Sequence, residues 1–548
     1  MKNKTLMPLI YSALIAVGVL FGIYIAKSNN IITTPKSSDN SLYIDDIFSL
    51  IDKEYVDTIN IKDLQMKAVT HVLETMDPHS EYIKPEVLNE VNENLYGSFH
   101  GIGVSFRIEK DTIAIINTIK GGPSEKVGIM AGDRIVYVND TLIAGTKVTN
   151  KDAMRLLKGP KKTKVDVKIK RRGVEELLDF TIIRDVIPTH SVDVAYMIDD
   201  NIGFVKMTKF SATTHKEFVN ALRKLKAEGM TQLILDLRGN TGGYLGEAVG
   251  VVDEMLSDNN LIVYTEGEHR ERSYLFSRHR GLWEDKDVVV LIDEGSASAS
   301  EIVAGALQDN DRGTIIGRRS FGKGLVQEQF DLGENGAIRL TVARYYTPTG
   351  RCIQKPFSGG KEEYLLEEYS RYTTGEMFSI DSIHFADSLK YITPKGKIVY
   401  GGGGIMPDIY VPLKNDSTHY FFNKMANSGI LFQYAFDYVD SHRKEILNYG
   451  NVKNFNEKFV FTDAMFNELM RRTEEKKITG NKEDKAKARE LSEPIFKAYV
   501  ARDVFGDEAF YILYEPIDEI LQEAISYQRS AVSDQPSAIS RDVTPVAY

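Results

Sequence analysis

The spacing of apolar residues changes several times along the chain, and each change predicts a different kind of element. Apolar residues recur at helical spacing between residues 42 and 91, with an interruption expected at residues 77–80, because a proline disfavours helix at the residue before it. Residues 97–184 instead hold short strand-like runs separated by glycine-containing turns, with one short helix expected at residues 150–157. Residues 201–237 then follow the order strand, helix, strand, which is typical of a β-α-β unit and predicts an α/β core.

The second half of the chain begins with further strands and ends in helices. Residues 326–331 and 337–346 flank Asn335-Gly336, which predicts a β-hairpin with an Asn-Gly turn. Charged positions at residues 471–477 predict a solvated helix face. Helical patterns cover residues 420–442, 463–477 and 481–527.

The amino-terminal segment predicts the location of the protein. Residues 6–26 carry no charge and follow Lys2 and Lys4. About 20 apolar residues span a bilayer, and this run is longer than the core of a typical signal peptide. No A-x-A cleavage site is evident, so we expect an uncleaved single-pass anchor with the basic residues inside and the body outside. A cleaved signal peptide is the alternative, and it also places the body across the membrane.

Composition excludes some classes of function. The net charge of −10 argues against general nucleic-acid binding. Cys352 is the single cysteine, so an intramolecular disulfide is excluded. No His, Cys and Asp cluster has the spacing of metal ligands, and we therefore expect neither a metal nor another cofactor.

One stretch, residues 287–329, carries the candidate chemistry. Residues 288–292 form an apolar run that predicts a buried strand, and residues 301–309 have helical spacing. Ser298 lies in the small, polar connection between them. The N–H groups at a helix start have no partner within the helix, so a serine there can be a nucleophile that faces an oxyanion site. Small residues at such a turn can also simply form the turn.

A serine nucleophile needs a base, and Lys323 is the candidate. No histidine lies in residues 287–329, whereas Lys323 stands between Gly322 and Gly324. Burial can lower the pKa of a lysine toward neutrality, and serine–lysine pairs are a known variant of the catalytic triad. The F-G-K-G sequence could also be an ordinary turn or a phosphate loop, although it does not match the spacing of a P-loop.

Residues 296–327 resemble the C-terminal processing peptidases, also called tail-specific proteases. Their signature is S-A-S-A-S-E-I followed by F-G-K-G-x-x-Q, and both parts are present. The resemblance implies that Ser298 is the nucleophile, that Lys323 is the base and that Gln327 orients the lysine. It also implies two oxyanion donors. These are the N–H of Ala299 and an N–H from the D-L-R-x-N-x-G-G loop, which is that of Gly242 or Gly243.

The order of elements in residues 97–185 resembles a PDZ domain. The stretch P-S-E-K-V-G-I-M-A-G-D-R-I-V-Y-V-N-D lies at its centre. PDZ domains add a peptide C-terminus to a sheet as an extra strand and hold its carboxylate on loop N–H groups. The matching loop here is Gly101-Ile102-Gly103-Val104. The alternative is a PDZ fold that only packs against its neighbour.

Two further residues are expected to be structural. His79 lies in Asp77-Pro78-His79-Ser80, where no motif surrounds it with catalytic partners, and the family carries a matching D-P-H-S stretch. Asp309 lies near the end of the helix that follows Ser298, where an acid opposes the helix dipole. A buried partner would explain it.

The sequence therefore predicts a multidomain α+β protein with an α/β, Clp protease- and crotonase-like peptidase core. A PDZ domain is inserted, and residues 357–400 are an insertion relative to the minimal family core. The helical end is expected to be a dimerisation or partner-docking domain, which would make the protein a homo-oligomer, or a cap with no partner. The expected parts are an anchor (1–27), a linker (28–40), a helical region (41–96), a PDZ domain (97–185), the peptidase core (186–415) and a helical extension (416–548).

The predicted function is that of a membrane-anchored serine endopeptidase in the cytoplasmic membrane, with its body on the periplasmic side. It would capture apolar C-terminal tails of proteins on the PDZ domain and cleave them with Ser298 and Lys323. If the empty PDZ domain covers the site, binding of a tail would open it. The alternatives are an inert scaffold that binds protein C-termini and a non-proteolytic acyl-transfer enzyme that requires coenzyme A.

Overall fold

The computed structural model describes residue 17 and residues 44–278, 280–414 and 419–533. The predicted anchor and linker, apart from residue 17, and the last residues of the chain lie outside this part. None of the helices described is both long and apolar enough to cross a membrane. The chain divides into two compact units, residues 1–72 and 73–548.

The amino-terminal region contains the helices that its apolar spacing predicts. It also contains one short strand that the spacing did not predict. The helices are α2 (Ile44–Glu54), α3 (Ile61–Met76) and α4 (Pro85–Tyr96). Between α3 and α4, residues 77–80 form a loop and β1 (Glu81–Ile83) follows. The interruption expected at residues 77–80 is confirmed. Strand β1 was not predicted, because so short a strand is specified by its partner, β18, rather than by its own sequence.

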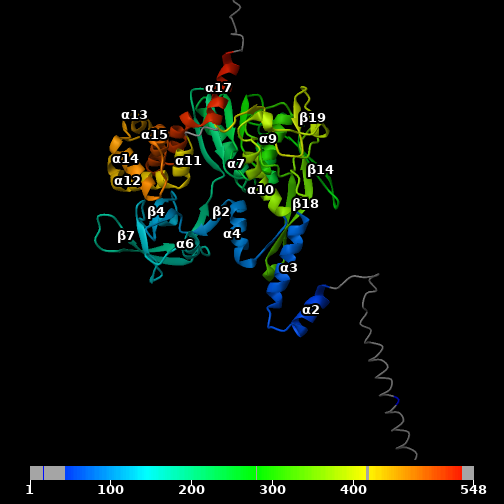
Figure 1. Ribbon diagram of the computed structural model, residues 1–548, viewed down its shortest axis with the longest axis horizontal. Helices are drawn as coiled ribbons and strands as arrows, with labels where there is room; N and C mark the ends of the chain where they lie inside the picture. Colours follow the sequence, from blue (N-terminus) through cyan, green and yellow to red (C-terminus); the bar gives the residue numbers. More distant parts are fainter. Residues whose placement is uncertain (1–16, 18–43, 279, 415–418, 534–548) are drawn as a thin grey trace, which may run out of the picture. The chain divides into compact units, whose positions relative to one another are not determined.

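The next module is a six-stranded antiparallel sheet with two helices (Figure 1). Its order is β3-β4-β5-β7-β8, with β6 paired to β5. Its core consists of alternating inward residues such as Ile113, Ile135 and Ile169, all fully buried. The module contains β3 (Val104–Glu109), β4 (Thr112–Thr118), α5 (Pro123–Lys126), β5 (Arg134–Val138), β6 (Thr141–Leu142), α6 (Asn150–Leu157), β7 (Lys164–Lys170) and β8 (Leu178–Ile183).

Two details of this module follow from local chemistry. Helix α6 has the predicted bounds because Thr149 and Asp152 form a reciprocal capping box. Strand β3 begins only at Val104 because Gly103 has a φ of +73°, which interrupts the extended chain before it. Strands β2 (Ser98–Gly101) and β9 (Asp185–Pro188) pair where the chain enters and leaves the module, so the module is an insertion in the fold.

The central sheet is six-stranded with the order β10-β11-β12-β15-β16-β21. Neighbouring strands in this sheet are parallel, except that β10 and β11 are antiparallel. Strands β11, β12 and β15 are continuous runs of buried residues, as expected for a parallel sheet covered on both faces. The strands are β10 (Val192–Met197), β11 (Ile202–Met207), β12 (Gln232–Asp236), β15 (Val288–Ile292), β16 (Thr314–Gly317) and β21 (Ile409–Tyr410).

Different helices cover the two faces of this sheet. One face, with Leu233 and Val290, packs on α7 (Thr214–Ala227), α8 (Leu245–Asp253) and α9 (Ala299–Asp309). The other, with Ile234 and Val289, packs on α17 (Glu519–Ser533) through Ile520, Leu521, Ala524 and Ile525. The last described helix of the chain therefore completes the central core.

A second sheet contains β1, β13 (Leu261–Gly267), β14 (Arg270–Phe276), β17 (Leu325–Asp331) and β18 (Ala337–Tyr346). Strands β17 and β18 form the predicted hairpin, but the predicted Asn-Gly turn is wrong. The connection is a 3-10 turn, η1 (Gly333–Asn335), closed by the Leu332 N–H on the carbonyl of Gly336. Gly336 is needed because a Cβ atom there would lie 2.2 Å from the carbonyl oxygen of Ile83.

Residues 357–400 and the carboxyl-terminal region add helical layers. The former hold α10 (Gly360–Thr373), the 3-10 turns η2 (Ile380–Ser382) and η3 (Asp387–Leu389), and a hairpin of β19 (Lys390–Ile392) and β20 (Ile398–Tyr400). A helical module with its own aromatic core around Phe455, Phe461 and Phe496 follows. It contains α11 (Tyr420–Asn427), α12 (Ile430–Leu447), α13 (Val452–Lys458), α14 (Asp463–Glu475), α15 (Lys482–Phe505) and α16 (Asp507–Tyr514), and η5 (Glu515–Ile517) connects it to α17.

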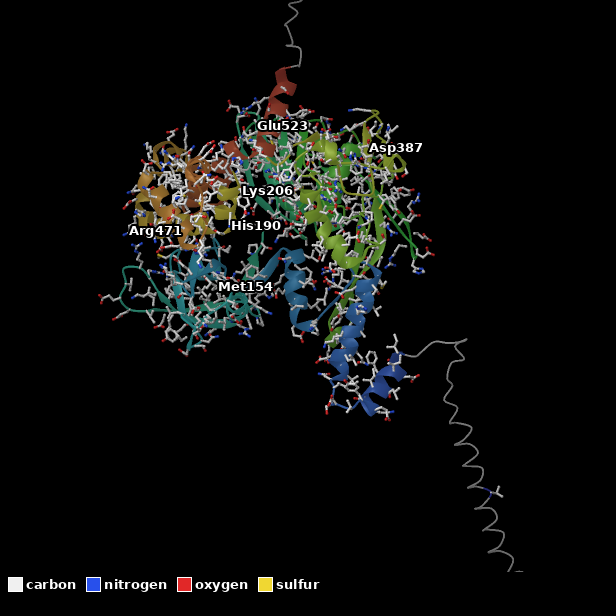
Figure 2. The ribbon with its side chains drawn as sticks, viewed as in Figure 1. Met154, His190, Lys206, Asp387, Arg471 and Glu523 are labelled. Atoms are coloured by element: carbon white, nitrogen blue, oxygen red, sulfur yellow. The ribbon has the colours of Figure 1, made fainter. Side chains whose placement is uncertain are left out.

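The charged positions near residue 471 lie on a solvated face, as predicted. Arg471 extends from α14 at the surface of this module (Figure 2). It pairs with Glu468 and Glu475 of the same helix. Such exposed pairs contribute little to stability.

A fully buried ion pair fixes the end of α9. The Arg351 guanidinium lies 2.7 Å from Asp309, and both side chains have 0% exposure. Asp309 also accepts hydrogen bonds from the N–H and hydroxyl of Thr349. The predicted buried partner of Asp309 is therefore confirmed, and it offsets the unfavourable position of an acid at a helix end.

We predict that Asp309→Ala lowers the free energy of unfolding of the central core by about 3–5 kcal/mol, because Arg351 would remain buried without its partner. The measurement is urea unfolding followed by the fluorescence of Trp283, the single tryptophan, which is fully buried in this core. The matched control is Asp179→Ala, which removes a surface pair with Lys168 and is expected to cost less than about 1 kcal/mol. Equal effects of the two variants would contradict the prediction.

Candidate functional site

The structure brings five of the residues predicted for the catalytic and oxyanion sites to one cavity of about 660 Å³. Ser298, Lys323 and Gln327 all line it. Gly242, Gly243 and Tyr345 line it as well. The cavity lies at the carboxyl ends of β12 and β15, where parallel α/β sheets commonly place their sites.

Ser298 occupies the first position before α9. The buried strand β15 ends at Ile292, and the chain turns through small residues into the helix. Ser298 has a φ of +55° and a ψ of −111°, a conformation that residues with a Cβ atom rarely adopt. A strained residue of this kind persists only where its surroundings hold it. The turn leaves the residue half-buried at the cavity wall.

The carboxylate of Glu301 holds this turn and the lysine loop together. One oxygen accepts from the N–H of Ser298 at 2.8 Å and of Lys323 at 2.9 Å. The other accepts from the N–H of Gly322 and the hydroxyl of Ser320. Burial raises the pKa of Glu301, and these hydrogen bonds oppose the rise. The two catalytic candidates are therefore tied to a single buried group.

Tyr345 makes the complementary connection between the same two loops. Its hydroxyl lies 2.5 Å from the carbonyl oxygen of Lys323 and 3.1 Å from that of Ser298. The ring is almost fully buried in the central core. Glu301 thus binds the N–H groups of the two residues and Tyr345 binds their carbonyl groups.

Lys323 lies in an environment that disfavours its charge. Burial is the largest cause that lowers its pKa, and the nearby Arg339 lowers it further. Its amine donates to Oε1 of Gln327 at 2.9 Å. The carboxylates of Glu81, Asp77 and Glu301 partly oppose the lowering.

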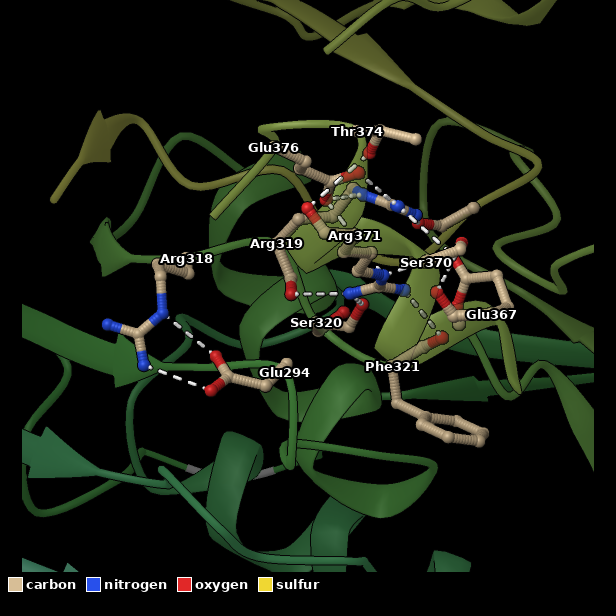
Figure 3. Close-up of polar contacts among 12 residues, drawn as sticks. Glu294, Arg318, Arg319, Ser320, Phe321, Glu367, Ser370, Arg371, Thr374 and Glu376 are labelled. Atoms are coloured by element: carbon tan, nitrogen blue, oxygen red, sulfur yellow. Dashed lines mark hydrogen bonds and ion pairs between the residues drawn. The ribbon is translucent and has the colours of Figure 1, made fainter. Parts of the chain in front are cut away.

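Helix α10 supports the loop that carries Lys323 (Figure 3). Arg371 of α10 donates to the carbonyl oxygens of Arg319, Ser320 and Phe321 at 3.0–3.2 Å. Arg371 also pairs with Glu367 of its own helix. The segment just before the lysine is thus held by a residue of the predicted insertion.

The glycine loop after β12 lies directly against Ser298. A Cβ atom on Gly242 would lie 2.8 Å from the Cβ of Ser298 and 2.9 Å from the nitrogen of Ala299. The N–H of Gly242 already donates to the side chain of Asn240. In contrast, the N–H groups of Gly243 and Ala299 have no protein partner within the described part of the chain. Of the two predicted glycines, Gly243 therefore has the free donor.

A buried charge cluster fixes the start of this glycine loop. Arg238 pairs with Asp236 at 2.6 Å and with Asp518 of the carboxyl-terminal region at 2.6 Å. Lys206 lies 3.1 Å from Asp236 (Figure 2 labels Lys206). Although burial alone would raise it, the pKa of Asp236 falls to about 2 because Arg238 and Lys206 favour the carboxylate.

The predicted carboxylate loop, Gly101-Ile102-Gly103-Val104, lies in the inserted module and not in this cavity. The carbonyl of Ile102 accepts from the N–H and hydroxyl of Ser124, which fixes the loop. Strand β3 follows the loop and lies at the edge of its sheet, where β4 is its only partner among the residues that the structure describes. A free edge beside a fixed loop is what addition of a peptide strand requires.

His79 lies near the site, but its ring faces another residue. The ring nitrogen Nε2 is 2.8 Å from the hydroxyl of Tyr364. Burial, followed by the charge of Lys323, lowers the pKa of His79 to about 4. The ring is therefore neutral at pH 7 and a poor base, in line with the expectation that His79 is not catalytic.

Sequence reasoning missed the residues that hold the site together. Glu301 had a signal, because Ser298 to Glu301 matches the S-x-x-E pattern of a capping box. Tyr345 and Arg371 had no such signal in the sequence, since each contacts residues that are far away in the chain.

Comparisons with known proteins match three parts of this chain to protein families. The model of peptidase family S41 matches residues 201–361, and the PDZ domain model matches residues 92–170. A family of unknown function, DUF8443, matches residues 421–506. The predicted fold class, a peptidase core with a PDZ domain and a helical extension, is confirmed.

Relatives with curated names share most of their length with this chain. A carboxy-terminal-processing protease of Bartonella bacilliformis is 38% identical over 314 residues, which are 56% of this chain and 71% of the relative. A carboxyl-terminal-processing protease of Synechocystis is 32% identical over 330 residues, 58% of this chain and 76% of the relative. A solved structure described as a photosystem II D1 C-terminal processing protease aligns at 25% identity over 67% of this chain and 87% of its own, with a TM-score of 0.35.

We predict that Glu301→Gln lowers the free energy of unfolding by about 1–3 kcal/mol, because an amide cannot accept the hydrogen bonds of all four donors. Urea unfolding followed by Trp283 fluorescence measures the loss. Glu328→Gln is the matched control, since Glu328 pairs with Arg270 at the surface. An unchanged midpoint for Glu301→Gln would show that the carboxylate does not hold the two loops.

Proposed function

Because this chain belongs to peptidase family S41 and is a serine protease of the carboxy-terminal processing type, we propose that Ser298 is its nucleophile and Lys323 its general base. The observation that carries this proposal is the shared cavity, whose wall contains both a lysine of lowered pKa and a strained serine at a helix start. Gln327, which accepts from Lys323, orients the amine.

The proposed reaction is an acyl transfer through a covalent intermediate. Neutral Lys323 takes the proton of the Ser298 hydroxyl while Oγ forms a bond to the peptide carbonyl carbon. The N–H groups of Ala299 and Gly243 bind the oxyanion, and one such donor is worth about 3 kcal/mol. The C–N bond then breaks as Lys323 returns the proton to the leaving amine. Water attacks the acyl-enzyme by the same path and releases the product.

The PDZ domain supplies the proposed recognition of substrates. An apolar C-terminal tail would extend the sheet along the free edge of β3. Its carboxylate would bind the loop N–H groups of Gly101-Ile102-Gly103-Val104. The preceding part of the substrate chain would then reach Ser298.

We further propose that the protease is anchored in the cytoplasmic membrane by residues 6–26, with its catalytic body on the extracytoplasmic side. The support is the uncharged run preceded by Lys2 and Lys4. An inert scaffold that binds protein tails is the second candidate, and it predicts binding without cleavage.

We predict that the full chain cleaves an unfolded substrate that ends in an apolar residue with a free carboxylate. The amidated form of the same substrate should be cleaved more slowly, because the PDZ loop loses the charge that it binds. Product formation is followed by mass spectrometry. Ser298→Ala should abolish cleavage, and cleavage by that variant would exclude Ser298 as the nucleophile. Tail binding without cleavage by the intact chain would favour the scaffold.

We predict that kcat/KM rises with pH and levels off above the pKa of Lys323, at a pH below the usual lysine value of 10.5, because only the neutral amine accepts the serine proton. Lys323→Arg stays charged and should lower kcat about 10²–10⁴-fold at every pH. The control Lys390→Arg changes an exposed lysine and should leave the profile unchanged. A pH-independent rate, or an active Lys323→Arg variant, would contradict the role of the lysine.

A further inference from the structure

Both ends of the Gln327 side chain are engaged. Gln327 lies on β17 at an irregularity in the pairing of β17 with β18. Its Oε1 accepts from Nζ of Lys323 at 2.9 Å. Its Nε2 donates to the main-chain carbonyl oxygen of His79 at 2.7 Å. The amide therefore bridges the lysine and the loop of residues 77–80.

The chemistry of the carbonyl determines which way the amide faces. A carboxamide has one end that accepts and one end that donates, whereas a main-chain carbonyl can only accept. The NH₂ end of Gln327 must therefore face His79, and its carbonyl end faces Lys323. In the reversed orientation the NH₂ group would repel the lysine ammonium. It would also donate to the lone pair that neutral Lys323 needs for the serine proton.

The loop that presents this carbonyl is firmly built. Asp77 and Ser80 are both buried. The Asp77 carboxylate accepts from the N–H of His79 at 2.8 Å, and from the N–H and hydroxyl of Ser80 at 2.8 and 2.5 Å. It also accepts from the hydroxyl of Thr341 on β18 at 3.1 Å, and the Thr341 N–H donates to Ser80 Oγ. The loop is thus attached to the strand next to the one that carries Gln327.

The ring of His79 anchors the loop on a second side. It contacts Tyr364 of α10 edge-on, with ring centroids 5.2 Å apart. Gln354 lies 3.4 Å from the Tyr364 hydroxyl and accepts from the N–H of Gly324, the residue after the lysine. The position of the His79 carbonyl is therefore set from β18 and from the lysine loop.

We propose that the loop Asp77-Pro78-His79-Ser80 is a positioning element of the catalytic site, which fixes the amide of Gln327 with its carbonyl toward Lys323 and so orients the base. This inference rests on the proposed roles of Ser298 and Lys323. The D-P-H-S stretch acts through the main-chain carbonyl of His79. Its proposed role therefore requires no catalytic side chain in the loop.

The charges around Lys323 determine which substitutions can test the proposal. Arg339 of β18, Glu81 of β1, Glu301 of α9 and Asp77 of the loop itself all act on its pKa. A change of Asp77 would remove a charge as well as a hydrogen bond. The uncharged pair Ser80→Ala and Thr341→Val instead loosens the loop and leaves these charges in place. Tyr82→Phe is the matched control, because it removes one side-chain hydrogen bond of β1, to the carbonyl of Asn335, away from Gln327.

The first measurement is the titration of Lys323 itself, made on the full chain with Ser298→Ala. Trace acetylation at a series of pH values, read by mass spectrometry of the peptides, gives the pKa of each lysine. In Ser80→Ala/Thr341→Val we expect the pKa of Lys323 to fall by about half a unit or more, because its ammonium loses the carbonyl of Gln327. Tyr82→Phe should leave it unchanged. An unchanged titration in the double variant, with Trp283 fluorescence still native, would overturn the proposal.

The second measurement is a kinetic cycle with Ser298 intact. We expect Ser80→Ala/Thr341→Val to lower kcat about tenfold and to change KM less than about twofold, with the acidic limb of the pH profile at lower pH. In a Gln327→Ala background the same pair should lower kcat no further, because the loop acts only through Gln327. A further loss in that background would mean that the loop is merely structural. Should the double variant fail to fold, Thr341→Val alone, which keeps the shape of the side chain, gives the same comparison.

The two measurements separate the proposals. A shifted Lys323 titration in a protein that does not cleave would refute the proposed function and leave the positioning loop standing. Cleavage by the intact chain, together with an unshifted pKa of Lys323 in the double variant, would support the proposed function and refute the positioning loop.

Discussion

The site depends on one buried carboxylate. Glu301 is enclosed in the core, where a charge is unfavourable unless every oxygen lone pair finds a donor. The donors that it finds come from the turn of Ser298 and from the loop of Lys323. The need to satisfy that carboxylate thus enforces the geometry of both loops. Tyr345 binds the carbonyl groups of Ser298 and Lys323, so that neither loop can shift alone.

The residues that surround Ser298 and Lys323 come from distant parts of the chain. The sheet delivers Ser298 and the glycine loop at the carboxyl ends of neighbouring parallel strands, as its topology requires. The loop at residues 77–80 reaches Gln327 from the amino-terminal side, and Arg371 of helix α10 reaches the lysine loop. The catalytic candidates lie close together in sequence, whereas their supports do not.

This difference explains how much could be predicted from the sequence. The buried strand before Ser298 follows from a run of apolar residues, and the bounds of α6 follow from a strong capping box. Ser298, Lys323 and Gln327 were expected from a short motif, and the structure brings them to one cavity. Such features are encoded within a few residues.

The features that escaped prediction depend on contacts between distant segments. The turn after β17 was misjudged because the close approach of β1, and not an Asn-Gly preference, requires Gly336. The choice of Gly243 over Gly242 depends on a hydrogen bond to Asn240 that only the folded loop forms. Strand β1 was missed because its partner, β18, is far away in the chain.

Helix α17 covers one face of the central sheet, and this has a consequence for how the protein folds during its synthesis. Until residues 519–525 have left the ribosome, the face that carries Ile234 and Val289 lacks its cover, and Arg238 lacks Asp518. The segments that supply Ser298 and Lys323 are therefore synthesised before the helix that completes the core. A nascent chain thus contains both residues before this cover exists, so we expect the architecture to delay alignment of the site until residues 519–525 have been made.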